Sequence, residues 1–375
     1  MRRIYLDNNA MMLPTADHLA EVMQWVGDYM GNASNTHWVG RRAKLVLEKS
    51  REAVADLLGA HRSQLVFVSG ATEGNYMILS AVFKKLQRSK VLISGGEHVS
   101  HWQNAKQLAA EHGLEYIEIP LLASGQVDES ALLKALDDDV GYVGLFYVNH
   151  ETGIKNPISA LCPLIKQHAP HCYIHIDAAQ ALGKEDLSYV ASSVVDSLTV
   201  SSAKIGGLSG TGAVYIKDMA RFEHYMVGGQ QERGLRPGTE NLAGIISFGL
   251  RCRHVHDYPH WLSASRELFA YLHTSLRAIP GVHIHGDMQY SSQLALSFCL
   301  KGRSALSLQT AMEQYGIAVG HGSACQREPS SASSVLLSMG ADAWQASHSL
   351  RVSLSEHQKR EDLETFLGVV TGEFY

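Results

Sequence analysis

Short apolar runs alternate with amphipathic segments of helical length through most of this chain. Runs such as LVFV at 65–68, VLIS at 91–94 and YIHID at 173–177 are each about one strand long. The segments that follow the first two, 71–87 and 101–113, place apolar residues on one face of a helix. Continuous apolar strands separated by helices are typical of a mostly parallel sheet that is covered on both faces. The sequence therefore predicts an α/β fold.

The alternation changes near Gly249, which predicts a second, smaller α+β unit. Amphipathic and apolar segments continue beyond this point, at 265–279, 282–286, 293–300, 304–316 and 351–355. No low-complexity linker separates the two parts. We interpret 14–249 as a large domain, and 1–13 together with 250–375 as a small domain that carries a mobile cysteine-containing loop.

Composition excludes several classes of protein. The chain has 375 residues, 45% hydrophobic and 18% charged, as expected of a globular protein. Its net charge of −5, without a long basic block, argues against direct nucleic-acid binding. The N-terminus lacks the apolar core of a signal peptide, and no stretch has the length of a membrane helix, so we expect a cytoplasmic protein. The five cysteines lack CxxC spacing, which predicts neither a disulfide framework nor a metal site.

Two residues suggest a pyridoxal 5'-phosphate (PLP) site. Asp177 ends the apolar run YIHID, and Lys204 lies in a turn between an apolar strand and glycines. PLP chemistry needs a lysine amine that can form a Schiff base and a carboxylate that keeps the pyridine nitrogen protonated. Taken alone, Lys204 could equally be a solvated lysine at a strand end.

Further polar residues follow other predicted strands, where ligands of open α/β sheets bind. Ala71 and Thr72 begin a helix that could hold a phosphate, although Thr72 could simply cap that helix. His98 could stack on a ring or move a proton, or be structural. Asn149 and Gln180 could bind a ligand oxygen or satisfy a turn.

Two residues near the C-terminus complete the candidate set. Cys325 follows small residues and precedes a polar segment, so it could be a mobile nucleophile that attacks sulfur, or an adventitious surface thiol. Arg351 lies between apolar residues of a predicted strand, where an unpaired guanidinium is costly. Its anionic partner could be a substrate carboxylate or a structural carboxylate.

Taken together, the motifs of this chain resemble the cysteine desulfurases of the NifS/IscS type, within the class V aminotransferases of PLP fold type I. The resemblance covers nearly the whole chain, in the order of the family. It runs through YLDNNA, GNASNTHWVGRRA, FVSGATEGN, GEHVSHW, VNHETG, HIDAAQALGK, SSAK, GGQQERGLRPGTEN, GSAC and RVSLS.

The resemblance implies a role for each candidate. Lys204 would hold PLP and act as a base, Asp177 would pair with the pyridine nitrogen, and His98 would stack on the ring and transfer protons. The other implied cofactor contacts are Gln180 to the ring oxygen, Ala71, Thr72 and Ser201 to the phosphate, and Thr239 to the phosphate of a second subunit in a homodimer. Arg351 and Asn149 would bind L-cysteine, and Cys325 would accept its sulfur as a persulfide for an acceptor protein.

The chain departs from the family pattern at several positions. Ala203 replaces a histidine that contributes to phosphate binding, and Ser209 replaces a lysine, so PLP affinity is in question. Met11 and Met12 replace two hydroxyl residues near the substrate entrance, which leaves substrate fit open.

Three functions therefore compete. The first is a cysteine desulfurase, the second a selenocysteine lyase or another class V PLP enzyme, and the third a non-catalytic partner that has kept the fold. The sequence does not identify the pathway that receives the sulfur, whether iron–sulfur cluster assembly, tRNA thiolation or DNA sulfur modification.

Overall fold

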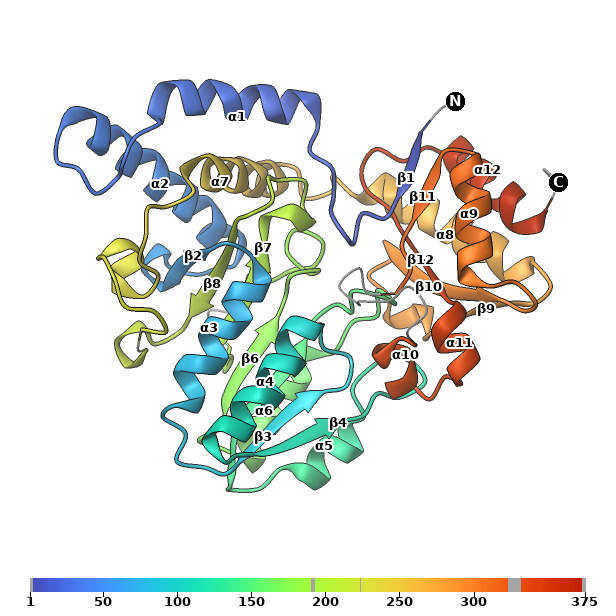
Figure 1. The fold of residues 1–375 in the computed structure, drawn as a ribbon, viewed down its shortest axis with the longest axis horizontal. Coiled ribbons are helices and arrows are strands. Elements are labelled where there is room, and N and C mark those ends of the chain that lie inside the picture. The colour runs from blue at the N-terminus through green and yellow to red at the C-terminus, as the bar shows by residue number, and fades with distance from the viewer. Residues whose placement is uncertain (1–2, 190–192, 223, 323–331, 373–375) are drawn as a thin grey trace.

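A seven-stranded, mostly parallel sheet forms the centre of the larger part of the molecule (Figure 1). The computed structural model describes residues 3–189, 193–222, 224–322 and 332–372. β8 runs antiparallel to its two neighbours, whereas the other neighbouring strands are parallel. In spatial order the strands are β2 (Leu65–Val68), β8 (Gly212–Ile216), β7 (Ser197–Ser201), β6 (Tyr173–Asp177), β5 (Val140–Phe146), β3 (Lys90–Ser94) and β4 (Glu115–Ile119).

Helices cover both faces of this sheet, which explains why most of its strands are buried along their whole length, the edge strand β4 being partly exposed. In β2, Val66 and Val68 join the buried cluster on one face, while Leu65 and Phe67 join the cluster on the other. This alternation follows from the two-residue period of a strand. The first face carries α3 (Ala71–Phe83) and α4 (Val99–His112), and the second carries α2 (Trp38–Leu57), α6 (Ile158–His168) and α7 (Leu242–Asp257), with α1 (Ala16–Tyr29) packed against α7 and α5 (Glu129–Ala135) beside β4 and α6.

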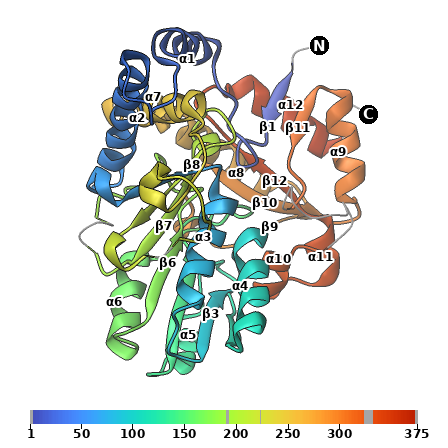
Figure 2. The same ribbon diagram turned by 60° about the vertical axis from the view of Figure 1, so that its left-hand side comes forward.

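The smaller part has a hydrophobic core of its own, built on two small sheets (Figure 2). One sheet is antiparallel and has the order β12-β10-β9, and the other is the parallel pair of β1 and β11. The elements of this part are β1 (Ile4–Leu6), α8 (Ser263–Ala278), β9 (Val282–Ile284), β10 (Ala295–Leu300), α9 (Ala305–Gln314), β11 (Ile317–Val319), β12 (Leu350–Ser353) and α12 (Arg360–Thr371). Between β11 and β12, α10 (Ser334–Ser338) and α11 (Ala343–His348) contribute buried residues to a hydrophobic cluster of the larger part.

The N-terminal segment connects the two parts. β1 pairs with β11 of the smaller part, and the chain then crosses to α1, which packs on α7 of the larger part (Figure 1). Residues 7–15 therefore pass between the two cores. This crossing brings Asn9 and Ala10 to the cavity described below.

The structure confirms the predicted fold class, an α/β protein with a mostly parallel sheet and a smaller part that contains antiparallel strands. The division at residue 249 stays a prediction, and α7 runs through this position without interruption. In the part of the chain that the structure describes, no helix has the length and apolar character needed to cross a membrane.

Candidate active site

A cavity of about 270 Å³ lies where β6 and β7 end and α3 and α4 begin. It brings together residues that are far apart in the sequence, from Asn9 to Arg351. Eight residues singled out in the sequence line it, namely Ala71, Thr72, His98, Asp177, Gln180, Ser201, Lys204 and Arg351. Their convergence follows from the parallel topology, because the carboxyl ends of parallel strands meet at one edge of the sheet.

Asp177 is the last residue of β6, and a buried polar network holds its carboxylate. The side chain is 8% exposed; Oδ2 accepts from Asn75 Nδ2 at 2.8 Å and Oδ1 from the backbone N–H of Ala179 at 3.0 Å. The network continues from Asn75, whose Oδ1 lies 3.1 Å from Nε2 of His175. Nδ1 of the same histidine is 2.7 Å from Ser197 Oγ. Burial holds the pKa of His175 well below its ordinary value, so this imidazole is neutral and gives the network no positive charge.

Lys204 ends a short 3-10 helix, Ser202–Lys204, directly after β7. Its Nζ donates to the backbone oxygens of Asn9 at 2.8 Å and Ala10 at 2.7 Å. Both acceptors lie on the N-terminal segment that crosses between the two parts. These carbonyl groups hold the amine at the wall of the cavity, where the chemistry of PLP requires a lysine.

Gln180 stands between Lys204 and a second lysine. Its Nε2 donates to the backbone oxygen of Asn9 at 2.8 Å, and its Oε1 accepts from Lys184 Nζ at 3.0 Å. The amide NH₂ group has two N–H donors, so one remains beyond the bond to Asn9. Since Gln180 lines the cavity, this donor is suited to a ligand oxygen.

His98 is the N-cap of α4, which fixes the position of its ring. Nδ1 accepts from the backbone N–H of Ser100 at 3.2 Å and lies 2.8 Å from Ser100 Oγ. Because Nδ1 is an acceptor, the ring proton of the neutral form is on Nε2. Burial, followed by the charge of His150, lowers the pKa of His98 to about 4. At neutral pH, His98 is thus an uncharged ring with a donor at Nε2.

The start of α3 lines one end of the cavity with the N-terminus of a helix. Its N-cap residue is Gly70, without a side-chain cap hydrogen bond, so Thr72 lies inside the helix and does not close it. Backbone N–H groups of the first helical turn, together with the helix dipole, favour an anion such as phosphate. Ser201, which ends β7 and is 7% exposed, lines the same cavity.

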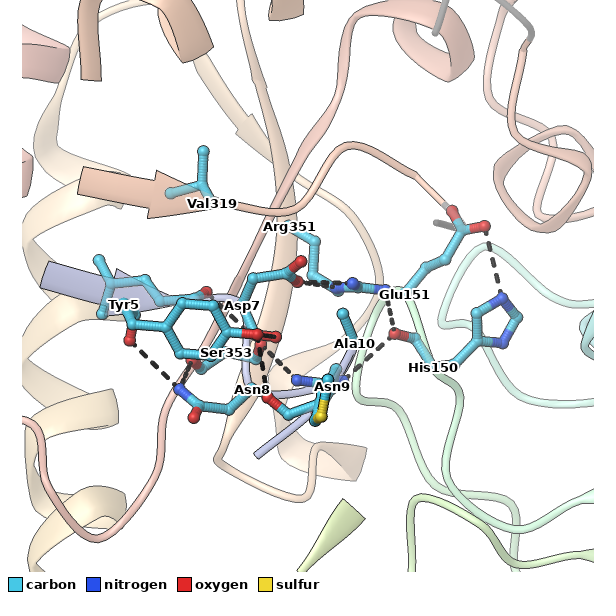
Figure 3. A network of polar contacts seen from close by, with 12 residues as sticks. Tyr5, Asp7, Asn8, Asn9, Ala10, His150, Glu151, Val319, Arg351 and Ser353 are labelled. Carbon is cyan, nitrogen blue, oxygen red and sulfur yellow. Dashed lines mark hydrogen bonds and ion pairs between the residues drawn. The ribbon is translucent and has the colours of Figure 1, made fainter. Parts of the chain in front are cut away.

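Arg351 in β12 is paired with a structural carboxylate (Figure 3). Nη2 and Nε donate to Asp7 Oδ1 at 2.6 and 3.2 Å, and Nη1 donates to the backbone oxygen of His150 at 3.0 Å. These bonds use three of the five guanidinium N–H groups. The side chain also lines the cavity, so Asp7 positions a guanidinium that retains N–H groups for a ligand carboxylate.

Three candidates from the sequence are not among the residues that line the cavity. The fully buried Asn149 donates through Nδ2 to Gly96 O, and its Oδ1 accepts from the backbone N–H groups of Glu151 and Thr152, which satisfies a turn. Thr239 is exposed on the segment before α7. Cys325 lies outside the described residues. The roles assigned to these three stay predictions.

Several residues at the site were not identified from the sequence. Asn9 lies in the quoted motif YLDNNA, but only the site's geometry shows that its backbone oxygen meets both Lys204 and Gln180. The ring of His150 stands edge-on to that of His98, with centroids 5.2 Å apart. Its Nε2 is 3.6 Å from Glu151 Oε1 (Figure 3). His150 sits in the motif VNHETG, where the sequence drew attention to Asn149 instead.

Over residues 4–366, the sequence matches the family model of the class V aminotransferases. The chain belongs to this family. A cysteine desulfurase of Nostoc sp. is 31% identical over 375 residues, covering 99% of this chain and 92% of that protein. One of Sinorhizobium fredii is 32% identical over 374 residues, covering 99% and 96%. The solved structure of a NifS-like protein has a TM-score of 0.91 at 28% identity, covering 100% of this chain and 99% of that one.

Class V aminotransferases use PLP, and the residues around the cavity fit this cofactor. The cavity offers a lysine amine, a carboxylate at a strand end, a neutral imidazole and a helix N-terminus, which match an aldehyde, a pyridine nitrogen, a ring face and a phosphate. Two of the departures from the family pattern concern the residues expected near the phosphate. Ala203 lines the cavity without a polar side chain, and Ser209 is exposed.

The two methionines near the predicted substrate entrance differ in burial. Met12 is 1% exposed, and its backbone N–H donates to the oxygen of Ala203 at 2.9 Å, whereas Met11 is 37% exposed. Neither side chain is among those that line the cavity in the described part of the chain. A direct effect on substrate fit therefore has no support in this geometry.

We expect this class V aminotransferase to lose stability when the pH falls from about 6.5 to 5. Burial lowers the pKa of His18, His98 and His285 to about 4. In this window the unfolded chain binds protons at these histidines and the folded chain does not. Each histidine therefore lowers the free energy of unfolding by about 1.4 kcal/mol for every unit by which the pH falls.

Urea denaturation at half-unit pH steps measures this effect. His285→Gln is a useful variant, since it removes one titrating ring while keeping an amide that can bond to Ser349 Oγ, the 2.7 Å partner of His285 Nε2. Its stability should depend less steeply on pH. A wild-type stability that stays constant across the window would contradict the prediction.

Proposed function

We propose that the protein is a PLP-dependent cysteine desulfurase, which converts L-cysteine to L-alanine and passes the sulfur, as a persulfide on Cys325, to an acceptor protein. The convergence of Lys204, Asp177, His98 and Arg351 on one cavity is the observation that carries this proposal. The full-length similarity to cysteine desulfurases supports the choice of substrate.

The reaction needs an electron sink, which PLP supplies when bound, with Asp177 keeping its pyridine nitrogen protonated. Arg351 binds the substrate carboxylate through the N–H groups that Asp7 and His150 leave free. Lys204, held by the carbonyls of Asn9 and Ala10, is placed to remove the substrate Cα proton and to return a proton later.

Sulfur transfer itself is assigned to Cys325. Its thiolate attacks the substrate sulfur, forming the S–S bond of the persulfide. The electron pair of the broken C–S bond stays with the substrate carbon, which takes up a proton and becomes the methyl group of alanine. The Nε2–H of the neutral His98 is a suitable donor for this proton.

The likeness to the family also supports a homodimer in which Thr239 reaches the phosphate of the second subunit. Thr239 is exposed and is not among the described residues that line the cavity of its own chain, as such a role requires. A selenocysteine lyase, or a protein that has kept the fold without activity, would use the same scaffold. The second of these is disfavoured by the intact polar environment of Asp177 and Lys204.

An absorbance spectrum of the purified protein between about 300 and 500 nm, before and after adding L-cysteine, tests the proposal. We expect a cofactor band that changes on addition of L-cysteine, together with one alanine and one sulfide equivalent per turnover when a thiol reductant is present. Absence of a band even after PLP has been added would overturn the proposal in favour of a non-catalytic protein.

A further inference from the structure

Lys184 is a buried cation to which the proposed reaction assigns no role. It lies in the segment after β6, is 6% exposed, and its Nζ donates to Gln180 Oε1 at 3.0 Å. In the described part of the chain, no carboxylate comes within 4.0 Å of this ammonium; the adjacent Glu185 pairs with Lys155 and Arg266 instead. A buried charge without an ion-pair partner is costly, which calls for an explanation.

Lys184 stands at the end of a continuous set of contacts that reaches Lys204. Lys184 donates to Gln180 Oε1, and Gln180 Nε2 donates to the backbone oxygen of Asn9 at 2.8 Å. Lys204 Nζ donates to the same oxygen at 2.8 Å. The two lysines are thus separated by one side-chain amide and one carbonyl group.

Lys184 and the Asn9 carbonyl together fix how the amide of Gln180 is oriented. An ammonium group can only donate, so the atom of Gln180 that faces it must be the oxygen. The NH₂ group then points the other way, toward Asn9 and the cavity. Without Lys184, the contact with the Asn9 carbonyl alone would hold the NH₂ group in this orientation, and the amide oxygen would lose its donor.

We propose that Lys184 is a positioning residue for the cofactor, which locks Gln180 with an N–H toward the phenolic oxygen of PLP and places a buried positive charge beside Lys204. This inference rests on the proposed use of PLP and goes beyond it, since it names a residue that acts through Gln180 without touching the cofactor.

The charges around Lys184 support the second half of the proposal. Burial, followed by the charges of Lys204 and Arg351, lowers the pKa of Lys184 to about 7, against an opposing effect of Glu185. Electrostatic interaction is mutual, so a charged Lys184 disfavours a second positive charge at Lys204. A lysine that must react as a nucleophile benefits from such a neighbour.

Lys184→Met provides the test, because methionine keeps an unbranched side chain of nearly the same length and removes both charge and donor. Two quantities are measured, the PLP dissociation constant and the pH midpoint at which the absorbance of the bound cofactor changes. We expect the midpoint to rise by about one pH unit, a tenfold gain in proton affinity, and the dissociation constant to rise about tenfold. Both changes follow from the loss of a cation and of an oriented donor.

Two control variants separate positioning from other effects. Lys155→Met removes a nearby cation that pairs with Glu185 at 3.1 Å outside the cavity, and it should leave the midpoint unchanged. Lys184→Arg keeps the charge and the donors, so its pH midpoint should lie close to that of the wild type. If Lys184→Met does not fold, Lys184→Gln, which is neutral but still a donor, gives the charge effect on the same readout.

A double-mutant cycle with Gln180→Met tests whether Lys184 acts through the amide. If it does, Lys184→Met has a smaller effect in the Gln180→Met background than in the wild type. Fully additive effects, or a wild-type midpoint in a folded Lys184→Met protein, would overturn the inference while leaving the proposed function intact. A wild-type protein that binds no PLP would instead overturn the proposed function itself.

Discussion

Replacing Lys204 with alanine should reduce alanine formation from L-cysteine by at least about a thousandfold. Lys204 is the one lysine among the described residues that line the cavity, and its amine donates to Asn9 O and Ala10 O. Its loss removes both the covalent link to the cofactor and the base beside the substrate. Alanine released per minute, measured with saturating PLP, gives the size of the effect.

A second readout shows whether Lys204 is the residue that carries the cofactor. Borohydride reduction followed by peptide mass analysis should place PLP on Lys204 in the wild type and leave Lys204→Ala unlabelled. Lys155→Ala is the matched control, because it removes a lysine that pairs with Glu185 and does not line the cavity in the described structure. This variant should behave as the wild type does. Alanine formation by Lys204→Ala within tenfold of wild type would show that the assignment is wrong.

The larger sheet could be predicted from the sequence because the patterns that identify its strands and helices lie within short segments of the chain. Strands buried on both faces are mostly apolar, and helices between them show their own period. As a result β2 and β6 coincide with segments identified as apolar, and β3 begins one residue before its segment. The position of Asp177 at a strand end followed from the same pattern. Parallel topology then brought the strand ends to one edge.

Pairings across the chain could not be predicted in this way. The sequence indicated that Arg351 needs an anion, but its partner, Asp7, lies 344 residues away. The pairing depends on β12 and the N-terminal segment meeting at the junction of the two parts, where Asp7 forms a bridge with Ser353. The sequence also left open whether that anion was structural or belonged to the substrate, and the structure shows a structural carboxylate on part of the guanidinium.

The site likewise shows why single polar residues are ambiguous in sequence. Asn149 and Gln180 both follow strands and carry the same functional group, and each could satisfy a turn or bind a ligand. In the structure Asn149 accepts from two turn N–H groups, whereas Gln180 links Lys184 to Asn9 and lines the cavity. Only the partners of each amide, fixed by tertiary packing, distinguish the two cases.

Replacing Cys325 with alanine should separate cofactor chemistry from sulfur transfer. Because Cys325 is assigned no contact with PLP, the variant should keep the cofactor band and its response to L-cysteine. Its formation of alanine from L-cysteine should fall by at least about a thousandfold, since the attacking thiolate is gone. Alanine and persulfide are measured together, the latter by labelling the protein before and after a reductant.

The other thiols cannot take over this role, which makes the prediction sharp. Cys162, Cys172, Cys252 and Cys299 are buried, and burial raises the pKa of each, to about 12 for Cys162 and Cys172. Their thiolates are therefore scarce and shielded at neutral pH. Iodoacetamide should accordingly inactivate the wild type with one label, on Cys325. Continued alanine formation by Cys325→Ala would refute sulfur acceptance by this residue. A wild type that acts on L-selenocysteine but not on L-cysteine would favour the lyase, because selenium can leave without attack by a thiol.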